Sequence, residues 1–377
     1  MIKETNRKNI GLILTSSSWG GLEMNVIKLT KLLFAQGYNI SFFLIKGSKV
    51  DDEISKTLIP VYYIAPHMKY FDIHGAFKFS MLLRKLSVKN LIAFDNRDLD
   101  FVFFVKLFNR KKINVIYQQH MQIGISKKDV IHTLRFSAIN YWLTPLEFLK
   151  KEIERHTRFN PDKVKVVPLG TDIQKFTTNK YTKSEARDKL GLNKSSFIIG
   201  IIGRIDPKKG QLFLTQAIHK LLKLYPRIEL LIIGETTFHD PLSEKYIREI
   251  KEYIRTHNLY DNIHIRGFTR DVNLFYDAID LFALASENET YGMVTIESML
   301  AGVPIIATNS AGTPELLNYG EFGHLYTPFN MDEFCKIVSE VIANFENTIV
   351  MANKGKLEAI KKYSQDVECA RIQELIV

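Results

Sequence analysis

Short apolar runs recur along this chain, and each is followed by an amphipathic segment long enough to form a helix. Strands that alternate with helices favour parallel βαβ units, in which helices cover the faces of a buried sheet. In the first half, the apolar runs predict strands over residues 10–14, 39–44, 61–64, 91–94 and 113–117. The pattern restarts after residue 172 and predicts strands over 197–202, 230–233, 263–265, 281–283 and 304–307. This repetition predicts two consecutive α/β domains.

The 377 residues of the chain are enough for two domains that each bury a core of their own. The stretch Pro168-Leu169-Gly170-Thr171-Asp172 separates the two series of predicted strands. The polar segment 177–194 that follows is predicted to be a linker or a surface excursion. In sheets of this kind ligands bind at the carboxyl ends of the strands, so a functional site is expected on the loops there.

The excess of positive over negative charge lies entirely in the first half of the chain. Residues 1–170 hold 27 Lys/Arg against 14 Asp/Glu, net +13, and the remainder holds 24 against 27, net −3. A basic domain attracts nucleic acid, anionic lipid or a phosphorylated acceptor through the same long-range field. The sequence has no Cys/His finger and no aromatic RNA-binding signature, so a nucleic-acid partner is not expected. An anionic membrane or acceptor remains, beside the simpler alternative that the lysines keep the protein soluble.

The segment 75–90, GAFKFSMLLRKLSVKN, is the predicted membrane contact, because it combines apolar and basic side chains at helical spacing. It is equally compatible with an ordinary amphipathic helix of a sheet domain. Cys335 and Cys369 have no metal-ligand spacing and form no disulfide framework, which fits a reducing compartment. The N-terminal residues do not resemble a signal peptide, and no apolar run is long enough to span a bilayer. We expect a cytoplasmic protein whose membrane contact, if it has one, is peripheral on the inner face.

The stretch from Ser286 to Gly302, SENETYGMVTIESMLAG, places two carboxylates across a predicted junction between a loop and a helix. Glu289 lies in the polar loop, whereas Glu297 lies in a helix whose other residues are mostly apolar. A carboxylate in that setting needs hydrogen-bond donors, which the two hydroxyls of a ribose would supply. A glycine lets the chain turn into the helix, and the first helical amides are then available to a phosphate. The amides concerned are those of Gly292, Met293 and Val294.

A second charged stretch, GRIDPKKG at residues 203–210, follows the strand predicted over 197–202. Arg204 offers paired donors to phosphate oxygens, and Lys209 supplies a point charge. The alternative is a solvated lysine turn without a ligand. A rival metal signal is Asp98-Leu99-Asp100, because paired carboxylates chelate divalent cations. Since this triplet opens the apolar run FVFFVKLF, it is interpreted as the start of a helix, where the dipole favours acidic residues.

In their order along the chain, these stretches resemble the landmarks of the family 4 glycosyltransferases, which are retaining enzymes of the GT-B fold that use nucleotide sugars. The landmarks here are Gly20-Gly21-Leu22-Glu23, His120, VKVVPLGTDIQKF at 164–176, GRIDPKKG at 203–210, SENETYGMVTIESMLAGVPIIAT at 286–308 and AGTPELL at 311–317. Three positions depart from the family pattern. The usual Pro-Ser is Ala285-Ser286, Phe-Gly is Tyr291-Gly292, and a pair of glycines is Ala311-Gly312. None of these changes removes a charged group to which chemistry is assigned.

The resemblance implies two Rossmann-like β/α/β domains that face each other across a deep interdomain cleft. Residues 1–168 would form the N-terminal, acceptor-binding domain, and residues 169–361 the C-terminal, donor-binding domain. A final helix, at about 362–377, would pass back onto the first domain.

The resemblance also assigns roles to individual residues. Arg204 and Lys209 would hold the donor diphosphate and neutralise its charge as it leaves, so that neither a metal nor another cofactor is required. His120 would lie beside the donor sugar, Glu289 would approach that sugar, and Glu297 would hold the ribose. Gly20 and Gly21 are expected to close a tight turn that admits a phosphate or an acceptor. The catalytic candidates are His120, Glu289, Arg204 and Lys209, and the donor-binding candidates are Gly20, Gly21, Gly203, Arg204, Lys209, Gly234, Gly267, Phe268, Glu289, Tyr291, Gly292, Met293, Val294 and Glu297.

The expected activity is transfer of a sugar from a nucleoside diphosphate sugar, with uridine as the expected base, to a hydroxyl of a saccharide or lipid-linked acceptor. Synthesis of a bacterial surface polysaccharide or lipopolysaccharide would use such a reaction. Two alternatives share the architecture, a nucleotide-sugar 2-epimerase and a catalytically silent nucleotide-sugar-binding protein. A dehydrogenase is not expected, because the first turn, SSSWGGLE, lacks the G-x-G-x-x-G fingerprint of dinucleotide binding.

Overall fold

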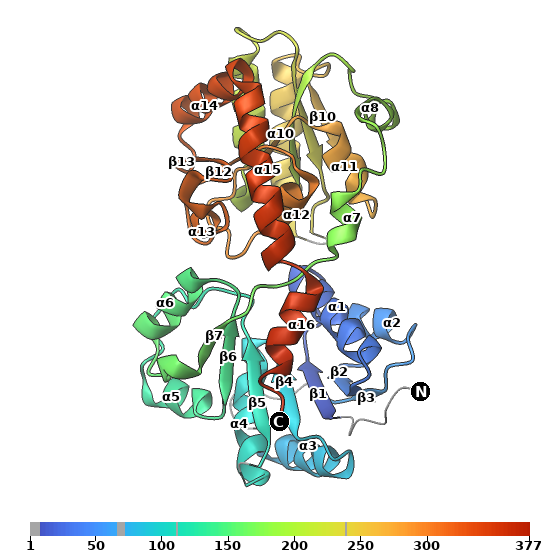
Figure 1. The fold of residues 1–377 in the computed structure, drawn as a ribbon, viewed down its shortest axis with the longest axis vertical. Coiled ribbons are helices and arrows are strands. Elements are labelled where there is room, and N and C mark those ends of the chain that lie inside the picture. The colour runs from blue at the N-terminus through green and yellow to red at the C-terminus, as the bar shows by residue number, and fades with distance from the viewer. Residues whose placement is uncertain (1–7, 66–71, 111, 238–239) are drawn as a thin grey trace. The chain divides into compact units, whose positions relative to one another are not determined.

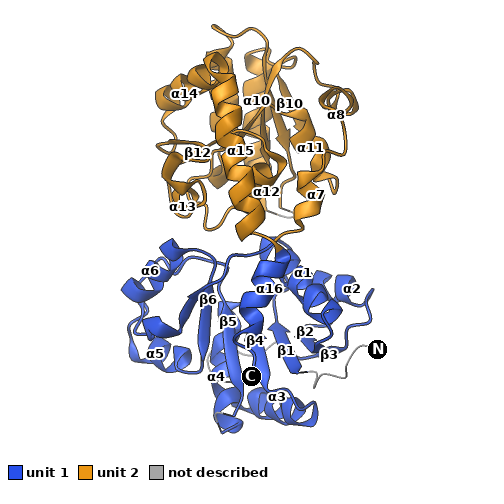
Figure 2. Ribbon diagram, viewed as in Figure 1, with its two compact units in different colours: residues 1–170, 365–377 blue, residues 171–364 orange. Residues whose placement is uncertain are grey.

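The computed structural model describes residues 8–65, 72–110, 112–237 and 240–377. The chain forms two compact units, of which unit 1 comprises residues 1–170 and 365–377 and unit 2 comprises residues 171–364 (Figures 1 and 2). Both are α/β units built on a parallel sheet, as the alternating pattern of the sequence predicts. None of the described helices is both long and apolar enough to cross a bilayer.

Unit 1 contains a seven-stranded sheet in the order β3-β2-β1-β4-β5-β6-β7. Its strands are β1 (Asn9–Leu14), β2 (Asn39–Leu44), β3 (Val61–Tyr63), β4 (Asn90–Ala93), β5 (Asn114–Gln118), β6 (Tyr141–Thr144) and β7 (Val164–Val166). Its helices are α1 (Gly21–Ala35), α2 (Lys49–Ile54), α3 (Ile73–Lys85), α4 (Leu99–Phe108), α5 (Val130–Phe136), α6 (Glu147–His156) and α16 (Gln365–Gln373). The short 3-10 helix η1 (Asn96–Asp98) precedes α4.

Each face of this sheet packs on its own hydrophobic cluster. Residues of α1, α2 and α16 cover one face, and residues of α3, α4 and α5 cover the other. Strand β1 pairs with both β2 and β4 inside the sheet, and most residues of these three strands are buried. Strands buried on both faces consist of nearly unbroken apolar residues, which is why the sequence shows them so clearly.

Helix α16 is held in unit 1 by a buried carboxylate as well as by apolar packing. Glu368 accepts hydrogen bonds from Nε2 of Gln118 at 2.7 Å and from the amide of Gly170 at 2.8 Å. Burial raises the pKa of Glu368, although these hydrogen bonds and the charge of Lys28 act in the opposite direction. The side chains of Cys369 and Ile372 lie in the core beside it.

Unit 2 contains a six-stranded parallel sheet in the order β10-β9-β8-β11-β12-β13. Its strands are β8 (Phe197–Ile202), β9 (Ile228–Ile233), β10 (Ile263–Arg266), β11 (Leu281–Leu284), β12 (Ile305–Thr308) and β13 (His324–Tyr326). Its helices are α7 (Ile173–Thr177), α8 (Lys183–Leu190), α9 (Gln211–Leu221), α10 (Pro241–Thr256), α11 (Val272–Ala278), α12 (Met293–Ala301), α13 (Thr313–Leu316), α14 (Met331–Ala343) and α15 (Phe345–Lys362).

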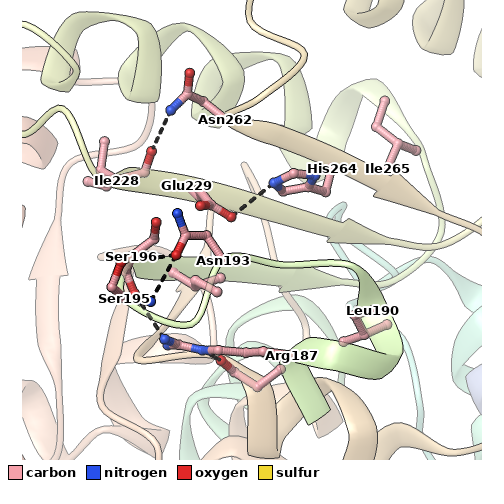
Figure 3. Close-up of polar contacts among 12 residues, drawn as sticks. Arg187, Leu190, Asn193, Ser195, Ser196, Ile228, Glu229, Asn262, His264 and Ile265 are labelled. Atoms are coloured by element: carbon pink, nitrogen blue, oxygen red, sulfur yellow. Dashed lines mark hydrogen bonds and ion pairs between the residues drawn. The ribbon is translucent and has the colours of Figure 1, made fainter. Parts of the chain in front are cut away.

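The segment 177–194, predicted to be a linker or a surface excursion, contains the ordered helix α8, which takes up 8 of its 18 residues. The Thr182 side chain accepts the amide of Glu185 and the Glu185 side chain accepts the amide of Thr182, which is a complete capping box. Arg187 is buried and donates to Asp280 at 2.6 Å and to the carbonyl of Ser196 at 3.1 Å. Figure 3 shows this guanidinium below the start of β8, beside a second polar pair on β9 and β10. Polar contacts thus hold α8 together with the buried Ala186 and Leu190.

The second pair in Figure 3 joins Glu229 of β9 to His264 of β10, with Oε2 and Nε2 3.0 Å apart. Nearby, Nδ2 of Asn262 donates to the carbonyl of Ile228 at 3.2 Å. These contacts lie toward the amino ends of their strands, as judged from the ranges of β9 and β10. Ligands of such sheets bind at the carboxyl ends, so this network has a structural role.

Ten predicted strands are confirmed to within three residues at either end, but β6, β7 and β13 were not predicted. The missed strands have three or four residues each, and β7 and β13 are the edges of their sheets. Edge strands are partly exposed and carry polar residues such as Lys165 and His324, which interrupts the apolar signal.

Candidate active site

In unit 2, the loop after β8 and the loop after β11 carry oppositely charged side chains that meet. Nζ of Lys209 donates to Oε2 of Glu289 at 2.5 Å, and Oγ of Ser286 donates to the same oxygen at 3.2 Å. The amide of Glu287 also donates to the carbonyl of Lys208 at 2.9 Å, so the two loops are joined through their backbones. The sequence predicts both charged residues at this site. Their ion pair and the hydrogen bond from Ser286 are seen only in the structure.

Gly210 allows these two loops to approach each other. Its φ of 76° lies in the left-handed region, and a Cβ at this position would lie 2.4 Å from the carbonyl oxygen of Ala285. Any other residue here would separate the loop that carries Lys209 from the loop that carries Glu289.

The other predicted cation, Arg204, has a different environment. Its side chain is 58% exposed, and its closest carboxylate, that of Asp206, is 3.8 Å away. An exposed guanidinium with only a long ion pair is available to bind an anion, whereas Lys209 already has a partner. The amide of Gly203, one residue earlier, donates a hydrogen bond to the carbonyl of Ile233 at 2.9 Å, and this bond fixes the start of the loop.

The start of α12 is the place at which the sequence predicts a phosphate site. Gly292 caps the helix with φ 77° and ψ 61°, which confirms the expected turn of the chain into the helix. Thr295 and Ile296 donate their amides to the Gly292 carbonyl, while the amides of Met293 and Val294 belong to the first turn, which has no acceptor within its own helix. Within the described part of the chain, the buried Oγ1 of Thr295 also has no hydrogen-bond partner. These donors favour an anion at this helix start.

Glu297, on the same helix, is half-buried and has a donor that the sequence does not identify. The hydroxyl of Tyr276 on α11 lies 3.1 Å from Oε2 of Glu297 and 3.1 Å from the carbonyl oxygen of Val294. Tyr276 is buried, and burial together with the charge of Glu297 raises the pKa of its hydroxyl well above the usual value. The phenol therefore stays protonated and orients the carboxylate. The need of a half-buried carboxylate for a donor was the only sequence signal for this contact.

The loops after β9 and β10, which carry the donor-binding candidates Gly234, Gly267 and Phe268, contact each other through one carboxylate. Oε1 of Glu235, next to Gly234, accepts the amide of Phe268 at 3.1 Å. The ring of Phe268 is 63% exposed, so an aromatic face is available to a planar ligand. Gly267 has no side chain where Glu235 passes, and a Cβ there would lie 3.1 Å from the same oxygen.

The remaining aromatic residue of the predicted donor set, Tyr291, is buried beside the α12 cap. The Tyr291 side chain therefore packs within unit 2 at the start of α12. In the adjoining loop, the amide of Gly312 donates to the carbonyl of Glu289 at 3.1 Å, and Ala311 has a φ of 49°. The family pattern has glycine at that position, so alanine here accepts a backbone conformation that costs about 1–2 kcal/mol.

In unit 1, His120 follows β5, at the carboxyl end of the strand. Its Nε2 is buried, and no residue that the structure describes forms a hydrogen bond with it. Burial lowers the pKa of His120 to about 4, while the charge of Asp95 opposes this shift and that of Lys28 adds to it. His120 is therefore neutral near pH 7, with a ring nitrogen able to bond a ligand hydroxyl.

The expected tight turn at Gly20 and Gly21 is wrong. The connection from β1 to α1 runs over residues 15–20, and Gly20 is extended, with φ −169°. The backbone requires glycine at neither position, since a Cβ at Gly21 would meet nothing within 4 Å. The connection is instead held by Glu23, which accepts a hydrogen bond from Oγ of Ser16 at 2.6 Å.

Asp98 and Asp100 lie at the start of α4, as predicted for helix initiation. Asp98 is fully buried and accepts the Thr15 hydroxyl, and Asp100 lies 3.5 Å from Nε of Arg135. Among the described residues, no group of three or more His, Cys, Asp or Glu side chains has an arrangement that could hold a metal ion.

The known proteins to which this chain is similar are glycosyltransferases. Residues 182–358 match the family model described as glycosyl transferases group 1. An uncharacterized glycosyltransferase of Haemophilus influenzae is 25% identical over 360 residues, which are 93% of this chain and 95% of that protein. The lipopolysaccharide 1,2-N-acetylglucosaminetransferase of Salmonella typhimurium is 28% identical over 237 residues, which are 62% of this chain and 60% of that protein.

Among solved structures, the crystal structure of Anabaena HepE in complex with UDP superimposes with a TM-score of 0.83 at 20% identity, covering 97% of this chain and 98% of that chain. The likeness and the two parallel-sheet units confirm the predicted fold class, GT-B with two Rossmann-like domains.

Proposed function

The chain is a glycosyltransferase of group 1, and we propose that it moves a sugar from a UDP-sugar to a hydroxyl of a saccharide or lipid-linked acceptor, with retention of anomeric configuration. The observation that carries this proposal is the meeting of Lys209 and Glu289 at 2.5 Å, close in sequence to the helix start at Gly292. A cation, a carboxylate and free helical amides in one unit suit a ligand with a diphosphate next to a sugar.

The two charges have distinct tasks in this proposal. In the ligand-free protein, Lys209 neutralises Glu289. A bound diphosphate competes for the ammonium, which leaves the carboxylate oriented by Ser286 toward the sugar, where positive charge develops at the anomeric carbon. Lys209 and the exposed Arg204 then stabilise the negative charge of the departing nucleotide. No metal is needed for this step, because protein cations supply the charge.

The nucleoside would be held at three points of unit 2. Glu297, oriented by Tyr276, accepts the ribose hydroxyls. The exposed ring of Phe268 and the neighbouring loop backbone at Gly234 and Gly267 accommodate the base. Uridine is supported by the UDP named in the structure of Anabaena HepE, and a surface glycan acceptor by the named activity of the Salmonella relative.

The acceptor would be bound by unit 1, where the neutral His120 offers a hydrogen bond to the reacting sugar. The basic composition of residues 1–170 supports peripheral contact with an anionic membrane, and we place the protein on the cytoplasmic face. The bacterial surface polysaccharide or lipopolysaccharide is the acceptor class that suits this location.

The decisive experiment tests four proteins, the wild type and three variants, with a panel of UDP-, GDP- and ADP-sugars. Wild type should bind UDP in a thermal-shift screen and should hydrolyse a UDP-sugar or transfer its sugar, whereas Glu289→Ala and Lys209→Ala should show a strongly reduced turnover. The matched control is Lys183→Ala, because Lys183 forms a similar ion pair, at 2.7 Å, with Asp280 at the opposite end of β11. Equal turnover in all four proteins would refute the assignment. Interconversion of the donor sugar without an acceptor would instead identify a 2-epimerase, and binding without any turnover a silent binding protein.

A further inference from the structure

Two buried glutamines precede His120 where β5 ends. The side chains of Gln118 and Gln119 are each 1% exposed. A buried amide is costly unless its polar atoms have hydrogen-bond partners, so the partners fix where such a side chain lies. The Gln119 backbone amide still donates to the Leu143 carbonyl of β6, at 2.8 Å. The contacts of these two glutamines therefore decide how the chain leaves the sheet at His120.

The two glutamine side chains point to opposite faces of the sheet, as neighbouring residues of a strand do. Oε1 of Gln119 accepts Nε1 of Trp142 at 2.9 Å, and its Nε2 donates to the Met121 carbonyl at 2.6 Å. Trp142 belongs to the cluster that packs with α3, α4 and α5. On the face covered by α16, Nε2 of Gln118 donates to Oε1 of Glu368 at 2.7 Å. The end of β5 is thus held from both faces.

Glu368 is itself fixed on its second oxygen. Its Oε2 accepts the amide of Gly170 at 2.8 Å, and the carbonyl of the same glycine accepts Nζ of Lys28 at 2.9 Å. The carboxylate is 5% exposed and has one donor on each oxygen. Hydrogen bonds to an ionised group are about twice as strong as those between neutral groups. Glu368 is therefore a rigid anchor for Gln118.

His120 lies near this anchor. Its ring centroid is 6.3 Å from that of Phe94, which belongs to the cluster that contains Ile372 of α16. Burial has the largest effect on the pKa of both Glu368 and His120, and the charge of Lys28 acts on both as well. Since Nε2 of His120 has no hydrogen bond to a residue that the structure describes, the ring depends on packing and on the end of β5 for its orientation.

We propose that Glu368 is a positioning residue for sugar transfer, which fixes Gln118 and thereby the placement of His120 at the carboxyl end of β5. This inference rests on the proposed function, in which His120 bonds the reacting sugar. It assigns to the last helix of the chain a part in catalysis as well as in folding.

Two substitutions at residue 368 separate the hydrogen bond from the bulk of the side chain. Glu368→Leu removes both hydrogen bonds. Glu368→Gln can keep them, because its oxygen can accept the Gly170 amide while the Gln118 amide turns and accepts from the new NH₂ group. With UDP-glucose as the probe donor, Glu368→Leu should lower kcat for hydrolysis about 10- to 100-fold, since a small misplacement of a reacting group is that costly. Glu368→Gln should restore most of this loss.

The KM for UDP-glucose should stay within about twofold of wild type in Glu368→Leu, because unit 2 holds the donor in the proposed function. Gln118→Leu breaks the same hydrogen bond from the other side and should reproduce the loss of kcat. The matched control is Arg371→Ala on the same helix. Nη1 of Arg371 donates to the Val166 carbonyl of β7 at 2.9 Å, so its removal loosens α16 without touching β5 and should leave kcat unchanged.

A double-mutant cycle tests whether Glu368 acts through His120. In a His120→Ala background, Glu368→Leu should cause no further loss of kcat. A loss that is undiminished in that background would overturn the proposal, and so would an equal loss in Arg371→Ala.

The NMR signals of histidine rings labelled with ¹³C at Cε1 give a second readout, which needs no turnover. The signal that is missing in His120→Ala should shift in Glu368→Leu and in Gln118→Leu, and it should stay in place in Arg371→Ala. An unshifted signal in the first two variants, or an equal shift in the control, would refute the positioning role. If His120→Ala hydrolyses UDP-glucose like wild type, the role of His120 in the proposed function fails, and the ring signal still decides whether Glu368 positions it.

Discussion

The substitution Tyr276→Phe removes a single oxygen atom and tests whether α11 orients the carboxylate of Glu297. The phenol has one hydrogen and two acceptors at 3.1 Å, Oε2 of Glu297 and the carbonyl of Val294. Phenylalanine keeps the ring and its packing against Phe275 and Phe282, which lie 5.0 and 6.3 Å away between centroids. The substitution therefore removes the hydrogen bond while the apolar contacts stay.

The expected effect follows from the strength of that hydrogen bond. A hydrogen bond to a charged group contributes about 1.5–3 kcal/mol, and here the hydrogen is shared between two acceptors, so we take about 1–1.5 kcal/mol for the orientation of Glu297. That loss corresponds to a nucleotide affinity about five- to tenfold weaker. Because the ribose is not the reacting centre, kcat should change less than the affinity.

Calorimetric titration with UDP measures this effect, and Tyr253→Phe is the control. The Tyr253 hydroxyl bonds Nδ1 of His219 at 2.9 Å, between α10 and α9, so its loss should lower stability without weakening UDP binding. A double-mutant cycle then separates orientation from general loosening. In a Glu297→Ala background, Tyr276→Phe should have no further effect on UDP affinity. If the loss is undiminished in that background, or if Tyr253→Phe reproduces it, the orienting role is refuted.

Four further predictions concern the candidate site residues of unit 1 and of unit 2. Lys209→Ala should lower donor turnover about 100- to 1000-fold, because the departing diphosphate loses its cation, and a turnover within tenfold of wild type would contradict this. Activity should survive EDTA, and a loss that magnesium or manganese restores would show that a metal is required. His120 has a folded pKa of about 4 and an ordinary one of 6.5, so the unfolded chain takes up the proton first and stability falls as the pH drops from 6.5 toward 4. Urea unfolding at pH 7 and pH 5 should therefore show a smaller loss of stability in His120→Gln than in wild type, and equal losses would refute the shift. Gly210→Ala should destabilise unit 2 by at least about 2 kcal/mol, as measured by the urea midpoint, because its backbone is left-handed and its Cβ would clash with the Ala285 carbonyl; a stable, fully active variant would show that the loops can separate.

The sequence predicts the central strands well because burial on both faces imposes an apolar run. β8 and β9 consist of buried or nearly buried residues throughout, and their apolar residues indicate a strand without further information. The prediction of a linker or a surface excursion over 177–194 misses helix α8 for the opposite reason. Helix α8 has little apolar surface, and it is stabilised by a capping box and by the buried Arg187, whose partner Asp280 lies 93 residues further along the chain. Composition alone cannot identify a helix that is held by such distant polar partners.

Contacts between residues far apart in the sequence also decide which residues of the candidate site could be predicted from the sequence. Arg204, Lys209 and Glu289 lie on loops that follow a strand, and the parallel sheet brings these positions to one edge whatever the details of packing. Glu289 and Lys209 are therefore placed near each other by topology alone. Tyr276 does not follow a strand, and its sequence context, VNLFYDA, is that of a core helix. The half-buried Glu297 indicates that a donor exists, but only the packing of α11 on α12 decides which of the surrounding side chains supplies it. The chemistry of Glu297 thus predicts that a hydrogen-bond donor lies nearby, and only the structure identifies that donor as Tyr276.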